Sequence, residues 1–385
     1  MNLINNWNNI KLEKIIKLEY GKGLPAKKRK IGEFPVVGSN GIVGCHNQAL
    51  VKGPNIVLGR KGTIGSVTLI NKDFWPIDTT YYLSFLTEDI DIKWIYYALK
   101  KLNLSKLKLS DVIPGLKRDL VYLQKIPLPP LPEQKKIAEI LSTVDLAIEK
   151  DNDAIIKINE LRKGLALKLF SQGIGHQKFK KTILGKIPYE WEIQKLDSLL
   201  ELCQYGLSIK MDSSGKYPII KMDNIKNGCV IHENLRYVNL NSKEFQKYKL
   251  EKGDILFNRT NSYELVGRTG VFTLEGDYVF ASYLIRLRAM YKQISPYFLA
   301  LYLIFKNDQL RQLATRAVHQ ANINATNLKG FSVLVPSLKE QKEITEIFNS
   351  IDHKMELLQA KREKLTSIKK GLMNDLLTGE RRVRL

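Results

Sequence analysis

The chain has 385 residues, 44% of them hydrophobic, which is enough to build the cores of about two ordinary domains. No apolar run reaches the roughly 20 residues needed to cross a bilayer, and the Asn-rich start lacks the apolar core of a signal sequence, so we expect a cytoplasmic protein. Its cysteines, Cys45, Cys203 and Cys229, are too few and too scattered for a disulfide framework or a paired-cysteine zinc site.

Positive charge is the main compositional signal. Lysine and arginine exceed acidic residues by 61 to 39, a net charge of +22, which indicates a polyanionic partner. Residues 1–132 contain 20 basic and 10 acidic side chains, residues 171–339 contain 24 and 14, and the segments 133–170 and 340–377 are neutral. Two equal basic blocks favour nucleic acid as the partner over a generally solvated surface.

The first basic block, residues 1–132, is predicted to be a mixed, β-rich domain. β-Branched runs punctuated by glycine occur at residues 36–44, 55–70 and 79–86, and an amphipathic helix is expected at Ile92–Leu102.

A long helix is predicted at residues 133–172, directly after a proline-rich segment. Its apolar residues recur four and three positions apart, the pattern of a helix that packs along a narrow seam. Asp151 and Arg162 interrupt this seam, which otherwise consists of Ile137, Leu141, Val144, Ile148, Ile155, Ile158, Leu165 and Leu169.

The second basic block, residues 173–339, repeats the order of strands followed by a helix. Strands are predicted at 217–225, 252–260, 267–274 and 278–290, and a helical stretch at 296–313. The two blocks together predict a duplicated α+β domain.

A second long helix with a basic tail is predicted at residues 340–385. Arg362 and Lys369 interrupt its seam, which consists of Ile344, Phe348, Ile351, Met355, Leu358, Leu365, Leu372 and Leu376. The segment repeats the first helix without a gap and with a period of 207 residues, from Glu133-Gln134 to Glu340-Gln341.

Neither long helix can bury its apolar seam alone. We therefore expect an internal pseudo-two-fold repeat in which the two helices pair as an antiparallel coiled coil and act as a rigid spacer. The alternative is two independent helices, each packed on its own domain.

At these residues the chain resembles the specificity subunits of type I restriction-modification systems. The helix-opening segments PLPPLPEQKKI and VPSLKEQKEI look like the conserved helical regions of that family, although the second copy lacks one proline. KGDILFNRT, GRTGVF and HQANIN in the second block, and GRKGTIG and FWPIDTTYYL in the first, look like its target-recognition domains. The usual Ser-Gln before the Asn-Ile-Asn segment is His319-Gln320 here.

The resemblance implies a division of labour. Each target-recognition domain would recognise one half of an asymmetric, interrupted site in double-stranded DNA, and the helix pair would fix the gap and dock two adenine methyltransferase subunits. Restriction complexes would add two ATP-dependent restriction subunits. S-adenosylmethionine, ATP and magnesium would be bound by those partners, and this chain would need no cofactor.

The sequence contains no catalytic motif that we recognise, so we expect a non-catalytic subunit. It lacks the Asp/Asn-Pro-Pro-aromatic motif of amino-methyltransferases, and the segment 59–65 lacks the Gly-Lys-Ser/Thr ending of a phosphate-binding loop. The five histidines lie far apart and predict no metal site.

Base recognition needs forked donors or paired donor and acceptor groups on elements that enter the major groove. Such residues cluster at four places, and our candidates are Ser39 and Asn40; Arg60, Lys61 and Thr63; Asn258, Arg259, Thr260, Asn261 and Arg268; and Arg316, His319, Gln320, Asn322 and Asn324. The alternative for the Asn residues beside glycines is that they only form turns.

A run of lysines and one arginine is the candidate for contacts with phosphates, which position a protein on DNA without conveying sequence. These residues are Lys27, Lys28, Arg29 and Lys30, and Lys22 lies just before them. The rival to the family-based function is a stand-alone bipartite regulator, which would need the same basic domains but no surface for docking enzymes.

Overall fold

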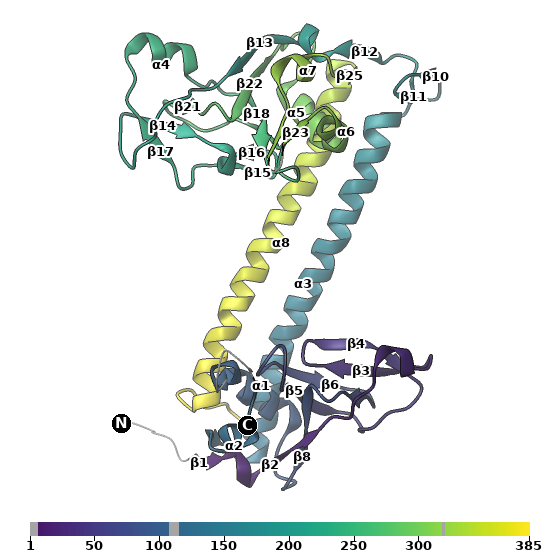
Figure 1. The fold of residues 1–385 in the computed structure, drawn as a ribbon, viewed down its shortest axis with the longest axis vertical. Coiled ribbons are helices and arrows are strands. Elements are labelled where there is room, and N and C mark those ends of the chain that lie inside the picture. Colours follow the sequence, from purple (N-terminus) through teal and green to yellow (C-terminus); the bar gives the residue numbers. More distant parts are fainter. Residues whose placement is uncertain (1–6, 108–114, 318–319) are drawn as a thin grey trace. The chain divides into compact units, whose positions relative to one another are not determined.

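The computed structural model describes residues 7–107, 115–317 and 320–385. The chain forms two units: Met1–Ile155 together with Leu357–Leu385, and Ile156–Glu356. Each unit therefore combines one predicted domain with parts of both long helices. Colours in Figure 1 follow the chain through these elements.

The described residues of the first unit form three small sheets and two short α-helices, besides the parts of the long helices. One sheet is antiparallel, in the order β2 (Ile16–Tyr20), β8 (Thr80–Phe85), β5 (Asn55–Gly59), β6 (Val67–Ile70). Another has the order β4 (Gly41–His46), β3 (Phe34–Gly38), β7 (Trp75–Pro76), and in the third β1 (Asn8–Lys11) pairs with β9 (Lys125–Leu128). Helices α1 (Ile92–Leu102) and α2 (Arg118–Tyr122) complete the unit, and α1 packs Trp94, Ile95 and Leu99 into the core.

The second unit repeats this plan with additions. Its main sheet has the order β13 (Leu200–Tyr205), β22 (Leu284–Ala289), β18 (Ile255–Asn258), β20 (Thr269–Val271), β16 (Cys229–Val230), β15 (Ile225–Lys226). Smaller sheets are β17 (Arg236–Val238), β14 (Tyr217–Ile220), β21 (Val279–Phe280); β12 (Glu192–Lys195) with β25 (Ser332–Val335); and β10 (Phe179–Thr182) with β11 (Gly185–Pro188). The helices are α4 (Ser242–Tyr248), α5 (Pro296–Phe305), α6 (Asn307–Gln312) and α7 (Ala325–Lys329).

The pairing pattern shows which elements correspond. The antiparallel neighbours β2, β8 and β5 match β13, β22 and β18, and the parallel pair β3 and β7 matches β14 and β21. Helices α1 and α5 each follow the last long strand of their sheet, and α2 and α7 lie 207 residues apart in sequence. The predicted duplicated α+β fold is confirmed.

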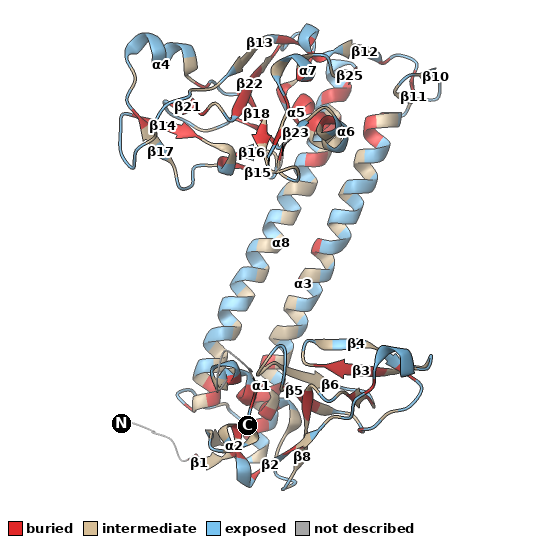
Figure 2. Ribbon diagram, in the orientation of Figure 1, coloured by how far each residue is buried: buried red, intermediate tan, exposed pale blue. Residues whose placement is uncertain are grey.

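The two long helices are α3 (Leu131–Gln172) and α8 (Leu338–Thr378). Most of the predicted seam residues are buried or half-buried, whereas the outer faces are exposed, as Figure 2 shows. In the first unit Asp145 pairs with Lys369 (2.5 Å) and Asp151 with Lys361 (2.8 Å). Because the partner number falls as the α3 number rises, the helices are antiparallel, as predicted.

In the second unit the helix pair is fixed by one ion pair and one aromatic stack. Arg162 donates two hydrogen bonds to the Asp352 carboxylate, at 2.6 and 3.1 Å. Phe170 stacks on Phe348 with 5.5 Å between ring centroids. Arg162 and Lys369, which interrupt the predicted seams, are therefore paired across the helices.

Gln134 and Gln341 join each long helix to the domain that precedes it. The Gln134 side chain is 1% exposed, accepts from the Asp91 backbone N–H at 2.8 Å and donates to the Asp89 and Pro129 carbonyls, both at 2.9 Å. Asp91 caps α1, so the amide ties the start of α3 to the start of α1.

Gln341 makes the same three contacts in the second unit. It accepts from Ser295 N–H at 2.7 Å and donates to the Gln293 and Pro336 carbonyls at 3.1 and 2.9 Å. The repeated glutamine of the sequence motif is thereby explained, because an amide offers both the acceptor and the two donors that these backbone groups need.

One predicted element differs in the structure. The helical stretch expected at residues 296–313 is two helices, α5 and α6, because the backbone leaves the helical conformation at Lys306 (φ −89°, ψ 10°). Asn307 begins the second helix, and its side chain lies beside Gly267.

Replacing Gln134 with alanine should lower the free energy of unfolding by about 3 kcal/mol, because buried backbone groups left without partners cost about 1–3 kcal/mol each. Gln341→Ala should have a similar effect. Thermal denaturation followed by circular dichroism measures both changes. The exposed Gln312→Ala is the control, and a Gln134 variant as stable as this control would contradict the proposed joint.

Candidate nucleic-acid interface

In the first unit the structure brings two predicted segments together. Ser39 and Asn40 form the two-residue turn between β3 and β4, and the Ser66 hydroxyl donates to the Ser39 carbonyl at 2.5 Å. A side chain at Gly62 would touch the Ser39 hydroxyl, so the turn lies against the loop that follows β5. Asn40, Lys61 and Thr63 are exposed there.

Arg60, at the start of this loop, stacks on an exposed tyrosine. Its guanidinium carbon lies 5.0 Å from the Tyr20 ring centroid, and Nη1 donates to the Asp78 carbonyl at 3.1 Å. Tyr81 lies beside Tyr20, and burial raises the pKa of Tyr81 to about 12. The Tyr20 ring and the Asp78 carbonyl therefore hold the Arg60 side chain in place.

The basic run divides into two kinds of residue. Lys22, Lys27, Lys28 and Lys30 are exposed. Arg29 instead donates to the Val43 carbonyl at 2.7 Å and the Leu24 carbonyl at 3.3 Å. Arg29 thus fixes the loop, whereas the lysines remain available to an anion.

In the second unit two predicted segments form one small sheet. β19 (Thr260–Asn261) pairs with β24 (Gln320–Asn322), which pairs with β23 (Thr315–Ala317). Spacing in the sequence does not indicate this pairing, because about 60 residues separate β19 from β24. Gln320 and Arg268 are exposed, and Arg316 lies in β23, whereas His319 lies outside the described residues.

Arg259 leads into this sheet in the same way as Arg60 leads into its loop. It stacks on Tyr205 at 4.6 Å, donates to the Ser282 carbonyl at 3.4 Å and donates to the Asn322 side-chain oxygen at 3.2 Å. The orientation of the Asn322 amide is therefore set by Arg259.

Four predicted residues are buried or hydrogen-bonded within the chain. Asn258 is fully buried, so its side chain is not placed to contact a base, and we correct its assignment. The Thr260 hydroxyl is also buried, and the Asn324 side chain caps α7 by accepting from Asn327 N–H at 2.7 Å. Asn324 is therefore a helix cap. Asn261 likewise accepts from the Ser262 N–H at 2.8 Å.

The tyrosines on which the arginines stack were not among the predicted residues. Tyr20 and Tyr205 each end a strand and each precede a glycine, Gly21 and Gly206. A side chain at either glycine would collide with the carbonyl oxygens of the neighbouring segment. The repeated Tyr-Gly pair was the available signal. Arg118 was also missed, and its guanidinium lies 4.7 Å from the Tyr20 ring.

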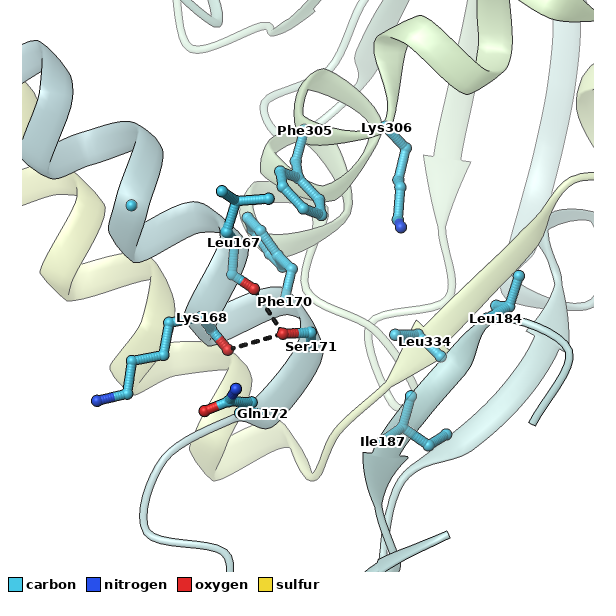
Figure 3. A pocket seen from close by; sticks show the side chains of 11 residues that line it. Leu167, Lys168, Phe170, Ser171, Gln172, Leu184, Ile187, Phe305, Lys306 and Leu334 are labelled. Atoms are coloured by element: carbon cyan, nitrogen blue, oxygen red, sulfur yellow. Dashed lines mark hydrogen bonds between the residues drawn. The ribbon is translucent and has the colours of Figure 1, made fainter. Parts of the chain in front are cut away.

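A pocket of about 510 Å³ lies elsewhere in the second unit, at the end of α3. Figure 3 shows Phe170, Phe305 and Leu334 in its apolar wall and the Lys306 side chain beside them. Burial lowers the pKa of Lys306. The residues that line the pocket include none of the DNA-contact candidates.

Among the residues that the structure describes, no group of three or more His, Cys, Asp or Glu side chains could hold a metal ion. Every helix in the same residues is too short or too polar to span a membrane.

Solved structures share the fold of this chain. The crystal structure of a type I restriction-modification system S subunit from M. genitalium aligns with a TM-score of 0.68 and 20% identity, over 98% of both chains.

Curated sequences show closer relatives. The putative type I restriction enzyme MjaX specificity subunit of Methanocaldococcus jannaschii is 35% identical over 209 residues, 52% of this chain and 49% of the relative. The MjaVIII specificity subunit of the same organism is 30% identical over 352 residues, 86% of this chain and 76% of the relative. The match therefore spans about half of the first relative and three quarters of the second.

The family model for the type I restriction modification DNA specificity domain matches residues 4–160 and 188–367, so both halves of the duplication are covered. The chain belongs to the family of type I restriction-modification DNA specificity proteins.

Proposed function

We propose that this chain is the DNA-recognition subunit of a type I restriction-modification complex and that its two domains each recognise one half of an asymmetric, interrupted site. The observation that carries the proposal is the family match over both halves of one duplicated chain. Each half also presents exposed polar and basic side chains next to a stacked arginine, Arg60 or Arg259. The net charge of +22 suits a polyanionic partner.

Within this proposal the chain itself is not catalytic. Two adenine methyltransferase subunits would dock on it, bind S-adenosylmethionine and extrude the target adenine, because a base inside a duplex cannot be methylated in place. Where cleavage accompanies methylation, two ATP-dependent restriction subunits would join. The relatives' names, which call them specificity subunits of restriction enzymes, support this division.

The first test is methylation-aware sequencing of the source genome with and without this chain. We expect adenine methylation to disappear at one asymmetric, interrupted motif when the chain is deleted. Expressing the wild-type chain from a plasmid should restore it. Survival of every methylated motif after deletion would favour the stand-alone regulator.

Substitutions in the two units should alter opposite halves of the motif. Asn40→Ala or Lys61→Ala should relax one half only, and Arg268→Ala or Gln320→Ala only the other, because the loss of one good base contact costs about 1–3 kcal/mol of discrimination. Methylation-aware sequencing of cells with each variant gives the result. A variant of one unit that altered both halves would refute the assignment.

Neutralising Lys27, Lys28 and Lys30 together should flatten the salt dependence of DNA binding without changing the motif. Each lost phosphate contact reduces the slope of log K against log salt by about 0.9. Binding isotherms at several salt concentrations provide the measurement. The matched control replaces the exposed α3 lysines Lys150, Lys157 and Lys163, and a change of motif in the test variant would show that the run contacts bases.

A further inference from the structure

One local arrangement is the same in both units. The backbone N–H of Arg60 donates to the Thr79 carbonyl at 2.9 Å, and that of Arg259 donates to the Tyr283 carbonyl at 3.0 Å. In each case Nη1 donates to the carbonyl of the residue just before, Asp78 or Ser282. Each guanidinium also stacks on the tyrosine that ends the edge strand of its sheet.

The carbonyl of the same arginine holds the segment that comes back to it. Arg60 accepts from the Leu116 N–H at 2.9 Å and Arg259 from the Ile323 N–H at 2.8 Å. Leu116 and Ile323 are 207 residues apart, the period of the sequence repeat. The arrangement therefore belongs to the duplicated framework.

The surroundings of the two arginines differ. The Arg118 guanidinium lies over Tyr20, whereas the Ala325 N–H donates to the Tyr205 hydroxyl at 2.8 Å. Arg259 also holds Asn322, and the matching position in the first unit is Gly115, which has no side chain to hold. The arginine, its tyrosine and its backbone contacts are therefore the same in both units. The residues around them differ, and we call these residues the variable rim.

The shared contacts of the two arginines restrict the part of DNA that they can contact. Domains that recognise different half-sites need different base-contacting groups. An arginine whose backbone contacts, Nη1 hydrogen bond and tyrosine stack are the same in both domains cannot by itself distinguish the halves. The part of DNA that both half-sites share is the phosphate backbone.

The positive charge of Arg60 and Arg259 and the surface position of their tyrosine stacks suit a phosphate group as the ligand. Tyr20 is 49% and Tyr205 40% exposed, so each stack lies at the surface. Within the described part of the chain, no carboxylate forms an ion pair with Arg60 or Arg259. Guanidinium has five donors, and the side-chain hydrogen bonds described above use one in Arg60 and two in Arg259, whose Nε is buried, so donors on the terminal nitrogens remain in both. A forked, unpaired cation matches the geometry of phosphate oxygens.

We propose that Arg60 and Arg259 are matched contacts to the DNA backbone, one in each domain, pre-oriented by Tyr20 and Tyr205. This inference rests on the proposed function and narrows it, because it removes both arginines from the set of base-contacting residues. Specificity then resides in the variable rim.

The test compares Arg60→Gln and Arg259→Gln with Arg60→Lys and Arg259→Lys in the full chain. Glutamine removes the charge and keeps an N–H donor on a shorter side chain, whereas lysine keeps the charge on a side chain of similar reach. Binding to a mixed-sequence duplex is measured by fluorescence anisotropy over a range of salt. Each glutamine variant should lower the slope of log K against log salt by about 0.9, and the double variant by about 1.8. The lysine variants should keep the wild-type slope.

The controls separate the possible outcomes. Arg236→Gln, an exposed arginine of β17 outside the stacks, should leave the slope unchanged. Equal melting temperatures show that a variant is folded, and the methylated motif should stay the same. An altered half-motif, or a wild-type slope in both folded glutamine variants, overturns the proposal. If the wild-type chain neither binds duplex DNA nor affects methylation, the proposed function itself fails.

Discussion

The joint between each domain and its long helix depends on one buried glutamine. A side-chain amide has the donors and the acceptor that three buried backbone groups require, and Gln134 and Gln341 satisfy the same three groups in their units. The glutamine fixes the first turn of the long helix against the first turn of α1 or α5. The apolar seam that follows therefore starts from a first turn that is held in one orientation on its domain.

The neighbouring glutamates differ between the units. Glu133 accepts from Arg382 in the basic tail, whereas Glu340 accepts from the Trp191 indole at 2.9 Å and from the Ile174 N–H at 2.8 Å, with His176 beside it. In both units the partners come from the segment just after a long helix. In each unit one carboxylate thus binds the segment that follows a long helix. Glu133 does so through an ion pair, and Glu340 mainly through neutral donors.

Local periodicity sufficed to predict the helices, because a seam of period near 3.5 involves residues that are close in sequence. The repeat was predictable from the gapless match between two segments 207 residues apart. The recognition surface needed contacts between distant residues. The pairing of Thr260 with Asn322 and the stacking of Arg259 on Tyr205 leave no periodic signal. The burial of Asn258 was missed because the sequence shows residue type and not which face of a strand is covered.

The charged residues in the seam show why α3 pairs with α8. Asp145–Lys369 and Arg162–Asp352 are the same pair under the 207-residue repeat, so two copies of α3 could form them too. Asp151–Lys361 has no counterpart, because the repeat places Leu358 and Ala154 at those positions. Asp151 is buried, and pairing with a second α3 would leave its charge without a cation, which is costly. A polar residue in an apolar seam selects partner and register in this way.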